Sequence, residues 1–466
     1  MATASLRKHD VDMTVGAIFP HLLRFALPLM LGNAFQQLYN TVDSVVVGNF
    51  VSKQALAAVG TLGPVINTLV GFFSGFSVGV SVIVSQRYGA HDAKGVHDAV
   101  HTSLLAVLIM SVFFTGIGVA LVNPMLRIVN TPEDVFPESY RYLTIFFSGI
   151  SGMMIYNIGA GILRAVGDSR RPLYFLIFSA LVNTVLDLVF VIRFHMGVAG
   201  VAWATVIAQF LSAVLILLVL MRAKESPYGL HPKDLHIDKA ILRRVIELGL
   251  PTALQQAITS FSNMFVQADI NQFGSACMAG WSSYGKLDQF ALLPLTSISA
   301  AGTTFVGQNV GAGQVSRAKK GIRTTILMSL CSVGILLTPL MLFAPQLTSL
   351  FNNDPEVIYY GTLFIRMISP FYLLVCLYDS EVGALRGVGE SRVPMILLLT
   401  GFVVIRQIYL FIITHTVNTI EAVAMGYPLG WMFCAIAIGL YFKFGKWEQR
   451  LINIPTDPEK TAKETK

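Results

Sequence analysis

Long apolar segments alternate with short polar ones along the whole chain, and this pattern predicts the fold. Each apolar segment has roughly the 20 residues that an α-helix needs to cross a bilayer. The pattern predicts twelve transmembrane helices, over 17–46, 55–84, 96–122, 135–163, 171–193, 198–221, 242–269, 277–306, 318–345, 358–386, 393–415 and 421–445. We therefore expect an all-α integral membrane protein.

One short stretch of sequence occurs twice. Residues 163–172 read LRAVGDSRRP, and residues 385–394, in the second half of the chain, read LRGVGESRVP. Gln86 recurs as Gln308 at the same separation. A period near half of a 466-residue chain indicates two copies of one unit. Because each copy has six spans, both enter the membrane in the same sense, and we predict two parallel six-helix lobes of the kind that transporters use.

The repeat sets the predicted domain limits. The N-lobe covers 1–221, a cytoplasmic linker covers 222–241, the C-lobe covers 242–447, and a polar cytoplasmic tail covers 448–466. Pro227, Gly229 and Pro232 break any helix in the linker.

Composition agrees with the membrane class and excludes others. Charged residues make up 13% of the chain, against about 25% in soluble domains. The net charge of +7 comes from Lys and Arg concentrated in alternate connections, which predicts orientation with both termini in the cytoplasm and does not indicate nucleic-acid binding. The polar start, 1–14, does not resemble a cleavable signal. We interpret the four cysteines as packing residues, since none has metal-ligand spacing.

Ionisable residues inside spans are costly and mark candidate sites. In the first half, Asp43 lies in span 1, Asn183 and Asp187 share one face of span 5, and Thr205 lies in span 6. Two carboxylates, an amide and a hydroxyl suit a Na⁺ site. Buried carboxyl groups could equally take a proton, or the set could be a purely structural hydrogen-bond network. Gln36, Tyr39 and Asn157 are the neighbouring candidates for a substrate cavity.

The second half carries both signs of charge in its spans. Asp269 lies near the end of span 7, and the candidates for a charged cavity wall are Lys286, Asp288, Asp379, Glu381 and Arg406. Ion pairs such as Lys286–Glu381 or Arg406–Asp379 would instead make this group structural. The copies differ here, because Asn183 aligns with Ile405 and Asp187 with Tyr409. We therefore expect the lobes to share a scaffold but not a coupling chemistry.

Two further features of the repeat concern the backbone. Pro28 and Pro251 open the first span of each lobe and favour a kink. In the repeated loop, we expect Gly167 and Gly389 to supply a positive φ at a tight turn, across which an arginine and the acid can pair. This loop is interpreted mainly as structural, with a conformational gate as the alternative.

Jointly, these motifs resemble the multidrug and toxic compound extrusion (MATE) family, in the branch with MepA-like and DinF-like proteins. The resemblance covers residues 15–447 and rests on Pro28, Tyr39 and Asp43 with Val47-Gly48, on 86–90, 161–168 and 307–312, and on Asn183, Asp187 and Thr205. It implies two six-helix bundles facing a central cleft. It also implies an N-lobe site for the coupling cation at Asp43, Asn183, Asp187 and Thr205, with Gln36, Tyr39 and Asn157 beside it. Asp379 and Glu381 do not fall at the span 10 acid of other branches.

The function expected from the resemblance is secondary active export of cationic or amphipathic organic compounds by rocking-bundle alternating access, in exchange for Na⁺ or H⁺. The residues leave the choice of ion open. We expect a monomer in the inner membrane of a prokaryote, in contact with lipid and without nucleic acid or a cofactor other than the coupling ion. The alternative is a flippase for a lipid-linked glycan or peptidoglycan precursor. A channel or an enzyme is disfavoured, because no filter-like loop or catalytic motif is present.

Overall fold

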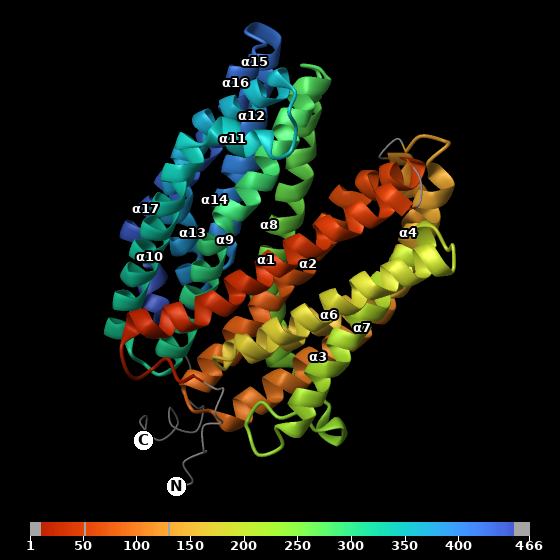
Figure 1. The fold of residues 1–466 in the computed structure, drawn as a ribbon. Coiled ribbons are helices and arrows are strands. Elements are labelled where there is room, and N and C mark those ends of the chain that lie inside the picture. The colour runs from red at the N-terminus through yellow and green to blue at the C-terminus, as the bar shows by residue number, and fades with distance from the viewer. Residues whose placement is uncertain (1–10, 51–52, 129–130, 452–466) are drawn as a thin grey trace, which may run out of the picture. The chain divides into compact units, whose positions relative to one another are not determined.

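The computed structural model describes residues 11–50, 53–128 and 131–451, without the side chains of 39–50, 53–61, 64, 128 and 450–451. Within these ranges the regular structure is entirely helical (Figure 1). The α-helices are α1 (Ile18–Phe50), α2 (Lys53–Gly89), α3 (Ala93–Ile128), α4 (Phe136–Ser148), α5 (Ile150–Ala165), α6 (Arg170–Leu188), α7 (Val198–Arg222), α8 (Lys239–Asn271), α9 (Ser275–Gly311), α10 (Val315–Leu342), α11 (Ala344–Ser349), α12 (Pro355–Ile368), α13 (Tyr372–Gly387), α14 (Arg392–Leu399), α15 (Arg406–Thr416), α16 (Ile420–Ala424) and α17 (Gly426–Phe444).

The predicted all-α membrane fold is confirmed. Among the described residues, ten helices are long and apolar enough to cross a membrane, and α4 with α5 forms an eleventh span bent by 47°. The bend falls at Gly149, where a Cβ atom would lie 2.3 Å from a methyl group of Val206. The twelfth predicted span corresponds to α8, which forms a helix of 33 residues but is too polar to count as a membrane-crossing helix by length and composition. Apolar side chains that face away from the interior, such as Val112 (75% exposed) and Ile335 (73% exposed), suit contact with lipid.

The described chain divides into two compact units whose limits cross the predicted domain limits. One unit holds Leu31–Val84 and Asp92–Gly249. The other holds Asp12–Met30, Ser85–His91 and the described part of the chain after Leu250. The start of α1 and the end of α2 therefore belong with the second half of the sequence.

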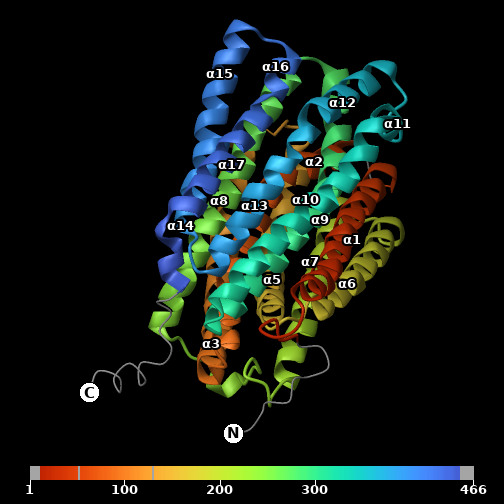
Figure 2. The ribbon, with the colours of Figure 1, turned by 90° about the vertical axis from the view of Figure 1, so that its left-hand side faces the viewer.

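Small residues bring the helices of the first unit close together. Gly152 and Gly159 of α5 face α7, where an added Cβ would lie 2.9 Å from the backbone nitrogen of Phe210 and 2.2 Å from a methyl group of Ile216. α6 and α7 lie side by side in Figures 1 and 2, and the Ser179 hydroxyl of α6 donates a hydrogen bond of 2.8 Å to the Ala208 carbonyl of α7. Such glycine contacts and interhelical hydrogen bonds replace the hydrophobic effect, which does not drive association in lipid.

The second unit packs α9 against α10, α12 and α13 (Figure 2). Its interior contains a cluster of aromatic side chains: Trp281, Tyr284, Phe364, Tyr372, Tyr427 and Trp431. Trp281 lies 5.0 Å from Phe364 and 5.5 Å from Tyr427 between ring centroids, within the range of favourable aromatic pairs.

The two copies of the repeated loop have the same backbone. Gly167 has φ 90° and Gly389 has φ 88°, as predicted, so both helices end in a turn that favours glycine. In the first copy Asp168 accepts hydrogen bonds of 3.1 Å from the backbone N–H groups of Arg170 and Arg171, and pairs with the Arg171 side chain at 3.2 Å. The acid therefore caps the following helix as well as pairing with an arginine.

The repeat also preserves an interhelical hydrogen bond. The Ser77 hydroxyl donates to the Asn157 carbonyl at 2.6 Å, and at the equivalent positions of the second copy the Ser299 hydroxyl donates to the Asp379 carbonyl at 3.0 Å. Since carbonyl acceptors are independent of side-chain type, Asn and Asp could diverge at this position while the scaffold stayed the same.

Candidate functional site

Three of the four residues predicted for ion coupling, Asn183, Asp187 and Thr205, are buried on α6 and α7. Asn183, Asp187 and Thr205 are 1%, 0% and 4% exposed. The Ser179–Ala208 hydrogen bond sets the register of the two antiparallel helices. Asn183 lies one turn after Ser179 on α6, and Thr205 lies about one turn before Ala208 on α7, so the two residues are at the same height along the helix pair. Asp187 lies one turn further along α6. The Thr205 hydroxyl donates to the Val201 carbonyl at 3.0 Å, and a hydroxyl that donates can still act as a ligand through its oxygen lone pairs.

The remaining N-lobe candidates have different surroundings. Gln36 is exposed on α1. The Asn157 amide group donates to the Met153 carbonyl of its own helix at 2.8 Å, so it is a local contact rather than part of the α6–α7 group. The side chains of Tyr39 and Asp43 lie outside the described residues.

A π-helical segment directly follows α6, the helix that carries Asp187. Val189–Arg193 continues α6 beyond Asp187, and Thr400–Ile405 occupies the middle of the corresponding span in the second half, immediately before Arg406. Wider π turns interrupt the regular hydrogen-bond ladder and are frequent at functional sites. The spans that carry Asp187 and Arg406 thus share a backbone irregularity that the hydrophobic pattern does not reveal.

In the second unit, Asp288 of α9 is bound by two tyrosines. It accepts hydrogen bonds from the hydroxyl of Tyr284, at 3.3 Å, and from the hydroxyl of Tyr372. The Tyr372 hydroxyl also lies 3.2 Å from that of Tyr284. Tyr284 lies one helical turn before Asp288 and could have been found from helical spacing. Tyr372 could not, because it belongs to a different helix, α13.

Arg406 is buried without a carboxylate beside it among the described side chains. Only 2% of it is exposed, and its guanidinium donates to Ser262 and Asn263 of α8, each at 2.9 Å. It also lies 4.9 Å from the centroid of the Tyr427 ring, a cation–π contact. Hydroxyl, amide and ring faces thus replace the anion that a buried arginine usually requires.

Neither ion pair considered from the sequence forms among the described side chains. Lys286 is exposed, with its ammonium 5.3 Å from the centroid of the Phe351 ring. Glu381 faces Gly439 of α17, and its Oε2 atom is buried without a hydrogen-bond partner in the described residues. Arg406 likewise bonds to Ser262 and Asn263, and the charged group that acts on the Asp379 carboxylate is Arg386. The charged candidates of the second half therefore do not form the two ion pairs considered from the sequence.

A contact missed by the sequence analysis joins the two copies of the Gln-x-x-Gly motif. An added Cβ on Gly89 would lie 1.9 Å from the Gln308 carbonyl oxygen, and one on Gly311 would lie 1.8 Å from that of Gln86. The side chain of Gln86 also donates to the Gly387 carbonyl at 2.8 Å. Each glycine thus lies against the glutamine of the other copy, within one compact unit.

The N-terminal segment is fixed beside this contact. The Met13 amide donates to the Gln308 side chain at 2.9 Å. Arg317 donates to the carbonyls of Met13, Val15 and Gly16 at 2.7–3.2 Å. Pro28 and Pro251 lie inside α1 and α8, which continue through them.

Comparison with known proteins decides the family. The MatE family profile matches residues 28–189 and again residues 251–412. The chain belongs to this family of MATE transporters. The starts of the two matches, at residues 28 and 251, keep nearly the spacing of the repeated motifs.

Full-length relatives agree with the assignment. The probable multidrug resistance protein YpnP of Bacillus subtilis is 28% identical over 94% of this chain and 97% of its own. The probable multidrug resistance protein NorM of Thermotoga maritima is 27% identical over 94% and 95%. The multidrug export protein MepA of Staphylococcus haemolyticus is 20% identical over 84% and 87%. The MATE membership predicted from the motifs is confirmed.

Solved structures share the fold. A MOP-superfamily transporter from Pyrococcus furiosus superposes with a TM-score of 0.89 at 24% identity, covering 96% of this MATE transporter and 99% of the other chain. A MATE-family multidrug resistance transporter in an outward-facing conformation has a TM-score of 0.88 at the same identity and coverage. This chain is thus a multi-pass membrane transporter, and the family to which it belongs consists of transporters rather than enzymes.

Proposed function

We propose that this protein exports cationic or amphipathic organic compounds in exchange for Na⁺ or H⁺, and that Asn183, Asp187 and Thr205, with Asp43, bind the coupling cation. The observation that carries the proposal is the burial of a carboxylate and an amide on α6 and of a hydroxyl on α7, the helix packed against it. Ionisable groups at membrane depth are expensive and are retained mainly where they serve transport. The names of the relatives, two multidrug resistance proteins and a multidrug export protein, support the substrate class.

The helix register supports including Asp43. Gly32 of α1 faces Leu173 and Leu176 of α6. Spans 1 and 5 of a bundle with alternating directions cross the membrane in the same sense. Eleven residues correspond to about 16 Å of helix, so position 43 on α1 reaches the level of position 187 on α6.

The proposed cycle is rocking-bundle alternating access in an inner membrane, with both termini in the cytoplasm. Entry of the cation favours the state that releases the substrate outside, and its departure inside favours the state that accepts substrate. The ion can drive this exchange only through its different affinity for the two states. Asn183 and Asp187 have no amide or carboxylate counterpart in the second half, at Ile405 and Tyr409, so we assign coupling to the first half.

The test is efflux of a fluorescent organic cation, such as ethidium, from proteoliposomes under separately imposed Na⁺ and pH gradients. Asp187→Asn and Asp43→Asn should each reduce gradient-driven efflux at least about tenfold, because the neutral amide loses the charge that binds the cation. Asp134→Asn, at an exposed acid of the α3–α4 connection, is the matched control and should transport like wild type.

Wild-type efflux by folded Asp187→Asn protein under both gradients would refute the ion site. If no organic cation moves under either gradient while a fluorescent lipid-linked sugar crosses the bilayer, the protein is the flippase considered as the alternative.

A further inference from the structure

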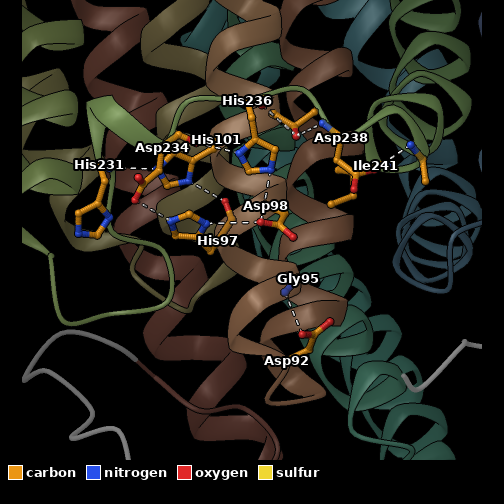
Figure 3. Close-up of polar contacts among 12 residues, drawn as sticks. Asp92, Gly95, His97, Asp98, His101, His231, Asp234, His236, Asp238 and Ile241 are labelled. Atoms are coloured by element: carbon orange, nitrogen blue, oxygen red, sulfur yellow. Dashed lines mark hydrogen bonds and ion pairs between the residues drawn. The ribbon is translucent and has the colours of Figure 1, made fainter. Parts of the chain in front are cut away.

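Four of the chain's nine histidines, none of them assigned to transport, lie close together in the first unit (Figure 3). His97 and His101 lie one turn apart near the start of α3. His231 and His236 belong to the connection between α7 and α8, which contains the short helix Pro232–Asp234. The His97 and His101 rings stack with their centroids 3.9 Å apart, and the His101 and His231 rings are 6.2 Å apart.

Three of these rings bring potential ligand atoms close together. His97, His101 and His231 each offer a ring nitrogen, and the three nitrogens lie within 4.8 Å of one another. Zinc bonds to imidazole of about 2.0–2.1 Å in tetrahedral geometry require nitrogens about 3.3 Å apart. Small rotations of the partly exposed His97 and His231 side chains could close this difference, since both lie at the end of the bundle rather than in its core.

Hydrogen bonds fix the tautomer of the His101 ring. Its Nδ1–H donates to the His97 carbonyl at 2.8 Å, which places the lone pair on Nε2. Metal-ligating histidines almost always donate their other N–H in this way. Nε2 accepts the backbone N–H of His231 at 3.0 Å, a neutral hydrogen bond that a metal ion would replace.

The other two rings have matching features. The Nδ1 atom of His231 is buried and has no hydrogen-bond partner among the described residues. His97 lies between two carboxylates, with Nδ1 3.5 Å from Asp98 and Nε2 3.7 Å from Asp234. The Asp98 carboxylate can hold the Nδ1–H of His97, leaving Nε2 and the half-exposed Asp234 on the side where an ion would bind.

We propose that His97, His101 and His231 bind a divalent transition-metal ion of the zinc class, with Asp234 as the fourth ligand and Asp98 orienting His97. Three imidazoles and one carboxylate are a donor set that Zn²⁺ and its neighbours Ni²⁺ and Cu²⁺ accept, whereas Na⁺, Mg²⁺ and Ca²⁺ prefer oxygen ligands. The site is thus chemically distinct from the oxygen-rich group on α6 and α7.

A bound ion would join the connection between the two repeats to α3. This connection already holds the start of α8 in place, because the Asp238 amide donates to the Thr102 hydroxyl at 3.0 Å and the Asp238 carboxylate caps Ala240 and Ile241 at 2.8 and 2.9 Å. Metal binding would therefore stabilise the segment from His231 to the first turn of α8.

The rival interpretation is a stack of neutral histidines that only packs the connection onto α3. That arrangement predicts no specific metal affinity. It also gives no account of the buried Nδ1 atom of His231, which a stacking role would leave without a partner in the described residues.

The experiment is Zn²⁺ titration of chelator-treated, detergent-purified full-length protein that carries no histidine tag. We expect one Zn²⁺ per chain by calorimetry. The double variant His97→Gln/His231→Gln should bind at least about 100-fold more weakly, because it loses two of the four ligands. His415→Gln is the matched control, since His415 is exposed on α15 and outside the cluster, and it should bind like wild type.

Two further measurements separate ligation from folding. Co²⁺ in place of Zn²⁺ should give the intense visible absorption of a tetrahedral site in wild type and lose it in the double variant. Zn²⁺ should slow protease cleavage of the 223–238 connection in wild type only. If the double variant does not purify as a monodisperse protein, Asp234→Asn should still lower the Zn²⁺ affinity. Zinc binding equal in wild type and double variant, or no stoichiometric binding by wild type, would overturn the proposal.

Discussion

The reciprocal contacts of Gly89 with Gln308 and of Gly311 with Gln86 give a testable prediction about how the protein changes conformation. Gly89→Ala places a methyl group 1.9 Å from the Gln308 carbonyl oxygen, and Gly311→Ala places one 1.8 Å from that of Gln86. Both obstacles are backbone atoms, which cannot rotate away as a side chain could. One segment must therefore move by about 1 Å, and overpacking of this kind costs about 1–3 kcal/mol.

The cost falls only on the conformation in which the two motifs touch. We expect transport to require that the two motifs separate, since the proposed cycle moves the two copies of the repeat relative to each other. A penalty of about 3 kcal/mol on the contacting state changes the ratio of the two states by a factor of about 150. The alanine variants should therefore shift the population toward the separated state while remaining folded.

The assay is the labelling rate of a cysteine at position 85, next to the contact, by a membrane-impermeant maleimide in nanodiscs. Ser85 is fully buried here. The background carries Cys331→Ser, because Cys331 is exposed whereas Cys277, Cys376 and Cys434 are buried. Gly89→Ala should raise the labelling rate of Ser85→Cys by one to two orders of magnitude, in line with the penalty above.

Gly116→Ala and Gly334→Ala are the matched controls, because an added Cβ at either glycine meets nothing within 4 Å. They should label like the parent and be slightly more stable, since alanine is the better helix former. Labelling of Gly89→Ala at the parental rate, with unchanged efflux, would show that the contact neither limits nor reports the conformational change.

Three further predictions follow from local geometry. Gly389→Val should lower the free energy of unfolding by about 1–3 kcal/mol, because φ at this position is 88°. Gly389→Asn should lower it by less, because asparagine tolerates this region. Thermal unfolding, monitored by size-exclusion chromatography, tests whether the two variants rank in this order. Arg317→Ala should expose residues 13–16 to proteolysis, because it removes four guanidinium hydrogen bonds to this segment. Arg317→Lys should keep only part of the protection, because an ammonium group cannot form the same four bonds. Equal cleavage of wild type and Arg317→Ala would contradict this prediction. Ser262→Ala should destabilise the protein by about 1–3 kcal/mol, because it removes the acceptor of one Arg406 N–H and leaves a second buried donor of Arg406, besides Nε, without a partner in the described residues. The double variant with Arg406→Met should recover part of that loss, and a double-mutant cycle measures the recovery.

The behaviour of the polar residues shows where sequence reasoning stops. Asn183 and Asp187 could be placed on one face of a helix from their spacing, and both are buried as expected. The partners considered for Lys286 and Arg406 were wrong, because charge complementarity says which pairs could form but not which helices meet. Arg406 is instead satisfied by Ser262, Asn263 and the Tyr427 ring, none of which stands out in the chain.

The histidine cluster likewise could be found only in part from the sequence. The spacing of His97 and His101 is visible in the sequence, but His231 lies far along the chain from His101 and approaches it only because α7 returns the chain to the start of α3.

The sequence by itself determined the class, the family and the internal repeat of this MATE transporter. The thickness of the bilayer sets the length of each apolar segment, so the spans can be recognised from local composition. A duplicated motif keeps its turn glycines, so the repeat can be recognised by comparing two short segments. Only the tertiary structure decided the reciprocal Gly89–Gln308 and Gly311–Gln86 contacts, the tyrosine pair on Asp288 and the polar partners of Arg406. These depend on the register and closeness of helices far apart in the chain, which are set by small residues and single hydrogen bonds rather than by any local pattern.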